Sequence, residues 1–179
     1  MIDIKTITAS EIDSRFGDLC TLLIDCVEDG ASIGFLPPLL ESDAKQYWKK
    51  VKECVKNNTA HLHIALFNGQ LVGCVLLSCS GKANGLHRAE IEKMMVSPTA
   101  RRRGIASSLL DQAESLALNL GLKLLVLDTR ENDVSEALYQ KHAFVKVGVI
   151  PQFALSSQGD LAGTSIYYKL IEARSLFVD

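Results

Sequence analysis

The fold is decided by the stretch Val96-Ser97-Pro98-Thr99-Ala100-Arg101-Arg102-Arg103-Gly104-Ile105-Ala106. A strand is expected to end before Pro98, and a helix is expected to begin at Gly104 after a turn. Unpaired N–H groups at a helix start attract a pyrophosphate. Gly104 lets the backbone approach closely, Ala106 keeps the next contact small, and the arginines add positive charge. The stretch therefore indicates either a pyrophosphate site or a solvated basic turn before a surface helix.

The segments on either side of this stretch alternate between strand and helix patterns. They predict a strand at 88–96, a helix at 104–120 and a strand at 122–128 that is buried on both faces. A short helix is then expected to start at a capping box of Asp133 and Glu136 and to end near Lys141. Two further strands are expected at 144–149 and 165–170. This alternation favours crossover units on a mixed sheet, with strands 88–96 and 122–128 adjacent and parallel.

The N-terminal third predicts helices and a hairpin. A strand is expected at 2–7, followed by a helix that Ser10 caps and that runs to about Val27. A loop set by Gly30, Gly34, Pro37 and Pro38 comes next. After it we expect a helix that follows Ser42 and places Trp48 in the core, and then strands at 61–67 and 70–78. Asn68-Gly69 suits the type I′ turn of a hairpin because both residues adopt positive φ there.

Length and composition limit the class of protein. The 179 residues fit a single domain spanning 1–179, and 47% of them are apolar. A net charge of −2 gives no electrostatic case for nucleic-acid binding. The start lacks a signal-peptide pattern, and no apolar run reaches membrane-spanning length. The five cysteines are expected to be reduced, so we expect a cytoplasmic protein. His61 and His63 have no accompanying ligand motif, and no metal site is expected.

Two motifs resemble one known family. Arg101-x-x-Gly104-x-Ala106 is similar to the Q/R-x-x-G-x-G/A signature of the GNAT superfamily of N-acetyltransferases, and Asn132 followed by Ala137-Leu138-Tyr139-Gln140-Lys141-His142-Ala143-Phe144 is similar to its second motif. The resemblance covers roughly residues 60–170, and Ala106 and Ala143 stand where glycine is commoner. It implies an α/β fold with a GNAT-like central mixed sheet of six or seven strands, about four flanking helices, and a splay between strands 88–96 and 122–128. It also implies acetyl-CoA as co-substrate.

The resemblance also assigns cofactor-binding residues. The pyrophosphate is expected on Arg101, Arg102, Arg103, Gly104, Ile105, Ala106 and Ser107, the pantetheine on the backbone of Met94 and Val96, and Asn132 is expected to bind cofactor or orient its loop.

Three side chains are the candidates for catalysis. Tyr139, at the family's tyrosine position, would protonate the leaving thiolate, and the alternative is a tyrosine anchored between core and solvent. Glu90, which shares a strand face with Glu92, would act as general base, or it forms an ion pair with Arg88 or a lysine. Asp128, at the end of its strand, would bind the acceptor's ammonium or assist its deprotonation, or it caps the next loop. His87 and His142 are expected at the surface.

The acceptor remains open between classes. The segments Gly30–Phe35, Asn84–Glu90 and Leu127-Asp128-Thr129 are similar to parts of the tabtoxin resistance acetyltransferase subfamily, which acts on a small amino-bearing toxin. The leading hypothesis is direct attack by the primary amine of a small molecule in a ternary complex, without a covalent enzyme intermediate. The alternatives are a protein lysine or N-terminal acetyltransferase and a non-catalytic acyl-CoA sensor.

Overall fold

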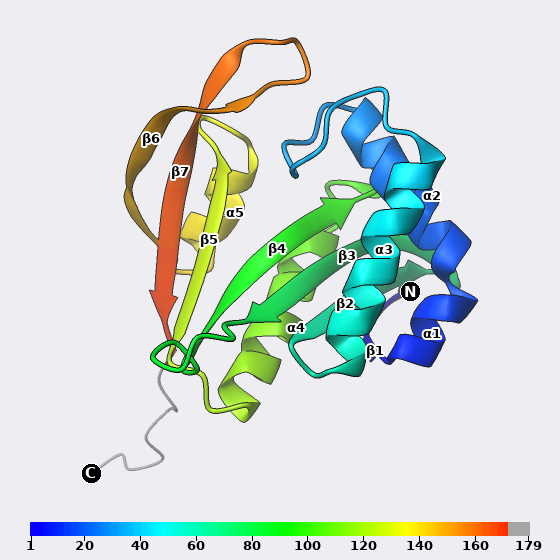
Figure 1. Ribbon diagram of the computed structural model, residues 1–179, viewed down its shortest axis with the longest axis horizontal. Helices are drawn as coiled ribbons and strands as arrows, with labels where there is room; N and C mark the ends of the chain where they lie inside the picture. Colours follow the sequence, from blue (N-terminus) through cyan, green and yellow to red (C-terminus); the bar gives the residue numbers. More distant parts are fainter. Residues whose placement is uncertain (172–179) are drawn as a thin grey trace.

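Seven strands form one mixed sheet in the order β1-β2-β3-β4-β5-β7-β6 in the computed structural model, which describes residues 1–171 (Figure 1). The strands are β1 (Ile2–Ile7), β2 (Ala60–Phe67), β3 (Gln70–Cys79), β4 (Arg88–Val96), β5 (Leu124–Arg130), β6 (Val145–Leu155) and β7 (Leu161–Leu170). β4 and β5 are parallel, and every other neighbouring pair is antiparallel. The predicted mixed sheet is confirmed, and its last two strands are longer than expected.

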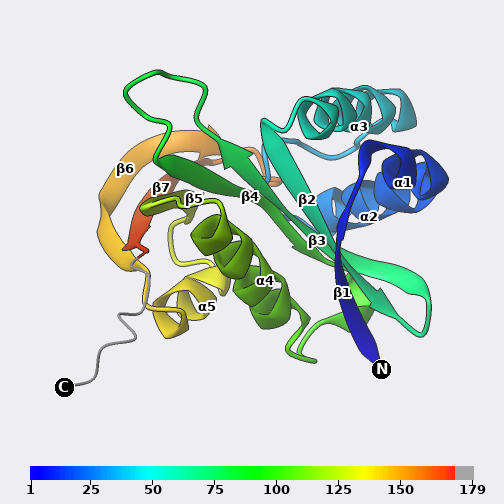
Figure 2. The same ribbon diagram turned by 90° about the horizontal axis from the view of Figure 1, so that it is seen from below.

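The helices cover both faces of the sheet. α1 (Ala9–Ser14), α2 (Phe16–Glu28) and α3 (Glu41–Lys56) lie on one face, and α4 (Ile105–Asn119) and α5 (Ser135–Lys141) lie on the other (Figure 2). A 3₁₀ turn, Pro98–Ala100, joins β4 to the segment before α4. Residues 1–171 thus hold five α-helices where about four were expected, because the first predicted helix is divided in two.

That division begins with a different cap from the predicted one. Thr8, not Ser10, caps α1: its hydroxyl accepts from the Glu11 N–H, and the Glu11 carboxylate accepts from the Thr8 N–H at 2.8 Å. This reciprocal pair is a capping box and outcompetes the single bond that Ser10 could offer. The helix then breaks at Arg15, whose φ of −112° is not helical, so the apolar periodicity continues across two helices.

Two other predicted boundaries need correction. α3 starts at Glu41 with Leu40 at its N-cap and no side-chain cap, so Ser42 lies inside the helix. β5 starts at Leu124, and only Leu125 and Leu127 of its first four residues are buried. The expectation of burial on both faces is wrong, because the core cluster on the α1–α3 face does not reach Leu124 and Val126, whereas Leu125 and Leu127 are buried in the cluster on the α4 face.

The core consists of two clusters, one on each face of the sheet. The first joins α1–α3 to β2 and β3 around Trp48, which is fully buried and donates from Nε1 to the Leu19 carbonyl at 2.9 Å. Truncating such a side chain to Ala costs about 3–5 kcal/mol. The second cluster packs α4 and Tyr139 against the other face. Asn68 and Gly69 have φ of 51° and 83°, as the hairpin prediction required.

The described residues contain no helix that is both long and apolar enough to cross a bilayer. All five cysteines are free, three of them buried, one half-buried and Cys54 exposed. Cys20, Cys26 and Cys74 thus lie in the core, as expected.

Candidate active site

The parallel strands β4 and β5 separate after three residue pairs. Arg88 faces Leu124, Ala89 faces Leu125 and Glu90 faces Val126, and no further pairing joins the two strands in the described chain. Figure 1 shows the strands diverging beyond this point toward their carboxyl ends. The predicted splay is confirmed. It leaves backbone N–H and C=O groups of β4 unpaired along the gap, where an extended amide-bearing ligand can pair with them.

A bulge in β4 decides which side chains face the gap. Cys74 pairs with Met95 and Leu76 pairs with Glu92, so Lys93 and Met94 together oppose the single residue Val75. Lys93 has a φ of 50°, in the left-handed region. An extra residue of this kind reverses the alternation of faces. Glu92 and Lys93, although consecutive, therefore both turn toward the side of α1–α3, the side on which Met95 is buried.

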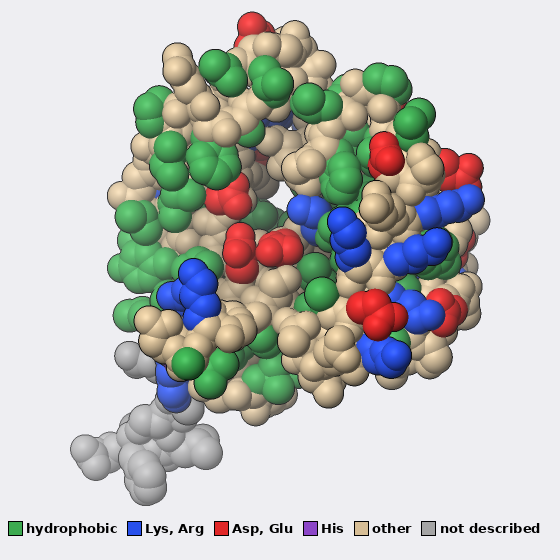
Figure 3. Space-filling model, viewed as in Figure 1, with side chains coloured by type: hydrophobic (Ala, Val, Ile, Leu, Met, Phe, Trp, Pro, Cys, Tyr) green, Lys and Arg blue, Asp and Glu red, His purple; other side chains and the backbone are tan. Residues whose placement is uncertain are grey.

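Three carboxylates lie on this side of the split. Burial raises the pKa of Glu90, and the nearby charges of Glu92 and Asp128 raise it further. Partial removal from water also raises the pKa of Asp128, while Lys93 opposes the rise for both groups. Figure 3 shows acidic side chains gathered beside a hollow in this face, with basic side chains at its far edge. Among residues 1–171 Glu90 forms no ion pair with Arg88 or a lysine, and Lys93 acts on its pKa only through its charge.

The start of α4 has a backbone arrangement that is able to bind an anion. Arg102 and Gly104 have φ of 61° and 78°, and Gly104 occupies the N-cap position. No side chain of the described chain caps this helix, so the N–H groups of its first turn have no partner from a cap. An added Cβ on Gly104 would meet nothing within 4 Å, which leaves open space in front of the turn. The helix dipole adds positive charge at the same point.

The three arginines of the motif do not act alike. Arg101 donates from Nε to the Val96 carbonyl at 3.2 Å and pairs with Asp29 at 2.6 Å. It therefore ties the end of α2 to the turn. The Arg103 guanidinium stacks over the Phe67 ring at 5.0 Å, while Arg102 is exposed. The sequence grouped these residues as a cationic rim, and the structure leaves Arg102 and Arg103 as the ones without a carboxylate partner among residues 1–171.

Tyr139 stands on α5 across the gap from the carboxylates. Its ring is buried against Phe144 and Tyr167, with centroid distances of 5.9 and 6.1 Å. Burial raises the pKa of its phenol, and the charges of Asp133 and Asp128 raise it further, so the group stays protonated at neutral pH. Among residues 1–171, no hydrogen bond alters the pKa of the Tyr139 phenol. The hydroxyl proton is therefore free for a ligand.

Glu136 fixes α5 to the sheet. Its carboxylate accepts hydrogen bonds from Tyr167 at 2.6 Å, from Ser165 at 2.8 Å and from the backbone N–H of Asn132 at 2.9 Å, and Lys146 adds an ion pair at 3.1 Å. The Tyr167 hydroxyl above all lowers the pKa of Glu136 to about 2. The predicted capping box does not form, because Glu136 is committed to β7. α5 starts after Val134, with Asp133 accepting from the Ser135 N–H instead.

The pantetheine and loop candidates have partners of their own. The Val96 carbonyl accepts from Arg101 and also from the Cys26 thiol at 3.6 Å, so that oxygen is already used within the chain. The Met94 side chain is partly buried and packs against the second core cluster, on the α4 face of the sheet. Asn132, exposed and with a φ of 62°, shapes the turn between β5 and α5 through its N–H bond to Glu136. Both of the expected roles of Asn132, binding the cofactor or orienting the loop, stay predictions.

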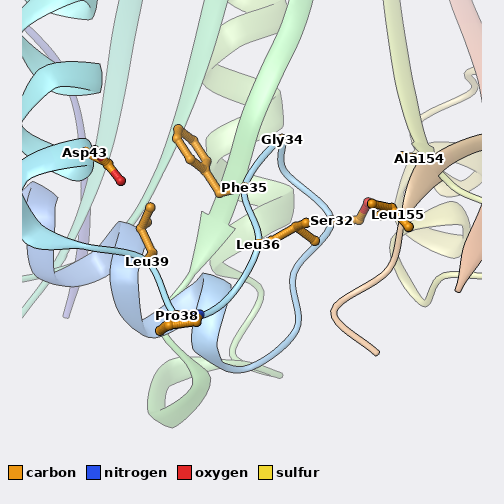
Figure 4. A pocket seen from close by; sticks show the side chains of 9 residues that line it. All are labelled: Ser32, Gly34, Phe35, Leu36, Pro38, Leu39, Asp43, Ala154 and Leu155. Atoms are coloured by element: carbon orange, nitrogen blue, oxygen red, sulfur yellow. The ribbon is translucent and has the colours of Figure 1, made fainter. Parts of the chain in front are cut away.

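The end of β5 contacts the loop after α2. The Arg130 guanidinium donates to the Gly30 carbonyl at 3.4 Å, which connects the end of β5 to the loop after α2. Beside them lies a cavity of about 480 Å³, lined by Ser32, Gly34, Phe35, Leu36, Pro38, Leu39, Asp43, Ala154 and Leu155 (Figure 4). The close view shows loop side chains on one wall and Leu155 of β6 on the other. Lys93 lies nearby, with its Nζ 6.0 Å from the centre of the Phe35 ring.

Sequence reasoning missed three of these residues. Lys93 faces the gap only because of the bulge, which no residue pattern in β4 announces. Arg130 owes its role to a contact 100 residues away. His142 was expected at the surface, and that is wrong: its side chain is only 8% exposed and lies 2.6 Å from the Ser107 hydroxyl. Its place directly after α5 and before Phe144 was the one available signal. His87 is exposed, as predicted.

The fold and the gap together define a class of protein. A parallel strand pair splits beside an uncapped helix start, with carboxylates on one side and a free phenol on the other, which is the arrangement of an acyltransferase that uses a CoA thioester. The sequence model of the acetyltransferase (GNAT) family matches residues 19–144, and the chain belongs to this family. It is an N-acetyltransferase, and acetyl-CoA is the acetyl donor of the family.

Individual relatives agree with this assignment. An uncharacterized N-acetyltransferase from the hisH-hisA intergenic region of Azospirillum brasilense is 29% identical over 116 residues, covering 64% of this chain and 67% of that protein. Among solved structures, a putative acetyltransferase from Salmonella typhimurium with its cofactor acetyl-CoA superposes with a TM-score of 0.77 at 13% identity, covering 99% of this chain and 98% of the other. A ribosomal-protein-alanine N-acetyltransferase from Brucella melitensis gives 0.78 at 19% identity, covering 94% and 99%.

Proposed function

We propose that this chain, as one N-acetyltransferase domain, transfers the acetyl group of acetyl-CoA to the primary amine of a small molecule by direct attack in a ternary complex. The observation that carries the proposal is the cluster of Glu90, Glu92 and Asp128 on one side of the split between β4 and β5. Three carboxylates attract an ammonium group, and a carboxylate with a raised pKa can accept its proton. The free cysteines fit the reducing environment of the cytoplasm.

The nitrogen of an ammonium loses two protons in this reaction, and the leaving sulfur gains one. Glu90, directly or through water, accepts the first proton and passes it to solvent, and the neutral nitrogen bonds to the acetyl carbon. As the carbon–sulfur bond breaks, Tyr139 donates its proton to the departing sulfur, and the second nitrogen proton, carried by water, restores the Tyr139 phenol. Asp128 orients the ammonium before it loses its proton. No step needs a covalent bond to the enzyme, in keeping with the absence of a nucleophile motif in the sequence.

The walls of the acceptor side support a small acceptor. The loop after α2 and the end of β6 line an open pocket of about 480 Å³, a volume within the usual range for small-molecule sites, although none of the three carboxylates lines it. The contact of Arg130 with Gly30 joins the end of β5 to the loop after α2. The chain's likeness to parts of the tabtoxin resistance acetyltransferase is a further reason to test amino-bearing toxins and antibiotics first.

A protein acceptor is the second candidate. The acidic face would also suit the ammonium of a protein N-terminus, and one structural relative carries the name of a ribosomal-protein-alanine acetyltransferase. At 19% identity this likeness concerns the fold alone.

The test is release of free thiol from acetyl-CoA against a panel of amines, amino acids, antibiotics and peptides. We expect turnover with small amines and little with peptides. Turnover with peptides alone would replace the proposal by the protein acetyltransferase. Tight acetyl-CoA binding without turnover across the panel would favour the non-catalytic sensor. The Tyr139→Phe variant serves as the matched control, since it retains the ring and loses only the proton donor.

A further inference from the structure

A chain of hydrogen-bonding groups runs beside the first turn of α4. The Ser107 hydroxyl lies 2.6 Å from Nε2 of His142. The other ring nitrogen, Nδ1, lies 3.4 Å from the Asp111 carboxylate and 3.8 Å from Oε1 of Glu114. Ser107, Asp111 and Glu114 all belong to α4, whereas His142 directly follows α5. The two helices are therefore linked through one imidazole ring.

The surroundings of the ring carry excess negative charge. His142 is nearly buried, and Oε1 of Glu114 is buried with no hydrogen-bond partner in the described chain. The other Glu114 oxygen pairs with Lys169 of β7, which neutralises part of that carboxylate. Asp111 has no cationic partner other than His142 among residues 1–171. Lys141, the neighbour of His142 on α5, is exposed and forms no ion pair in the same part of the chain. A proton on Nδ1 thus has two carboxylates to face.

The His142 ring has three protonation states, which differ in whether they leave the Ser107 hydroxyl proton free. A neutral ring with its proton on Nδ1 must accept from Ser107, so the serine turns only lone pairs toward the helix start. A neutral ring with its proton on Nε2 directs the lone pair of Nδ1 toward the carboxylates of Asp111 and Glu114, an arrangement in which like charges repel. The doubly protonated ring donates to the carboxylates and to Ser107, and the serine hydroxyl proton is then free to bond an anion.

We propose that His142 is a positioning residue that makes binding of the CoA diphosphate at the α4 start take up a proton. This inference rests on the proposed cofactor site. Protonated His142 turns the Ser107 hydroxyl into a donor for a diphosphate oxygen, and Asp111 and Glu114 stabilise the ring's added charge. Ser107 touches the ligand, and His142 acts through it.

The sign of the pH dependence follows from this coupling. A bound diphosphate favours the protonated ring, so the complex holds its proton to a higher pH than the free enzyme does. Affinity is therefore greatest at acidic pH and falls as pH rises through the range in which the complex loses the proton. The slope cannot exceed tenfold per pH unit, about the limit for a single linked proton.

Calorimetry with acetyl-3′-dephospho-CoA tests the coupling without relying on turnover. This ligand keeps the diphosphate but lacks the 3′-phosphate and the free thiol, which would titrate themselves. Titrations at one pH in buffers of different ionisation enthalpy measure the number of protons taken up, and a pH series measures the slope. The variants are His142→Gln and Ser107→Ala, and His87→Gln, an exposed histidine outside the site, is the matched control.

We expect fractional proton uptake, up to about one proton, in the wild type and in His87→Gln, and its loss in His142→Gln and in Ser107→Ala. Equal uptake in the wild type and His142→Gln would overturn the proposal, and so would the absence of uptake in the wild type across the neutral range, a result that needs no variant. A wild type that binds no ligand at all would instead overturn the cofactor site on which the inference rests.

Discussion

The two sides of the gap between β4 and β5 are built in different ways. The proposed cofactor side consists mostly of backbone: a left-handed Gly104, the uncapped first turn of α4 and the unpaired edge of β4. The proposed acceptor side consists of side chains from β4, β5, the loop after α2 and β6. A backbone site depends on a few conformational requirements and leaves a short sequence signature. A site made of side chains from distant segments leaves none, which is why the donor could be assigned and the acceptor could not.

The largest effect on this difference between the two sides is expected from a negative charge placed at the start of α4. Gly104→Glu adds a carboxylate where the diphosphate should lie. Repulsion between unit charges about 4 Å apart amounts to about 4 kcal/mol at an intermediate dielectric constant, so acetyl-CoA affinity should fall at least ~100-fold. Calorimetry measures the affinity, and circular dichroism checks the fold.

Gly104→Asn is the control for that variant. Asn tolerates the left-handed conformation and carries no charge, and an added Cβ at this position has open space. Its affinity should stay much closer to that of the wild type. A folded Gly104→Glu protein with unchanged affinity would show that the diphosphate binds elsewhere.

The next largest effect is expected for Tyr139, which borders both sides. Tyr139→Phe should lower kcat on the order of 100-fold and leave acetyl-CoA affinity nearly unchanged, because only the hydroxyl is lost. The loss should shrink with an acyl donor whose thiol is a better leaving group. Steady-state kinetics with the two donors give the answer. Near-normal kcat under conditions where chemistry limits the rate would reduce Tyr139 to a packing residue.

The acceptor side should respond mainly in its pH profile. Glu90 must be ionised to accept a proton, so activity should rise with pH through its raised pKa. Glu92→Gln removes a like charge that raises this pKa, and the acidic limb should move to lower pH. Glu90→Gln should remove the limb and lower kcat/KM by roughly tenfold to 100-fold. If the limb stays in place in Glu90→Gln, the base is Asp128 or another group.

The smallest effect concerns the frame that carries Tyr139. The folded-state pKa of Glu136 is about 2, below its ordinary value, so its ionised form stabilises the fold above that ordinary value. The contribution is lost as pH falls through the folded-state value. Glu136→Gln should cost about 1–3 kcal/mol at neutral pH, and the cost should shrink toward pH 2. Denaturant unfolding at several pH values tests this, and a cost independent of pH would point to packing alone.

The sequence predicted the sheet and the helix start because each has a local cause, whereas the split was expected from the family resemblance. Pro98 ends β4, Gly104 permits the left-handed turn, and Asn68-Gly69 sets the hairpin. The errors arose where local signals compete. Thr8 caps α1 because it pairs reciprocally with Glu11, and Glu136 leaves the predicted capping box for hydroxyl groups on β7 that are about 30 residues away.

The site residues show the same difference between features with a local cause and features that depend on distant contacts. Glu90, Asp128 and Tyr139 were selected from motif positions, and the structure places them around one gap. Arg101 was assigned to the cofactor from its motif position and its charge, and this stays a prediction; the structure adds its contacts with Asp29 and Val96, which the sequence did not predict. Lys93 and His142 depend on a bulge and on a contact between two helices, and neither can be seen along a single segment.

The most direct test of the central claim is a crystal structure of the chain with CoA. The account predicts diphosphate oxygens at about 3 Å from the N–H groups of residues 104–107. It also predicts that the pantetheine runs along the unpaired edge of β4 and that the sulfur lies within hydrogen-bond reach of the Tyr139 hydroxyl. A diphosphate bound away from the start of α4, or a sulfur far from Tyr139 with β4 and β5 still separated, would contradict it.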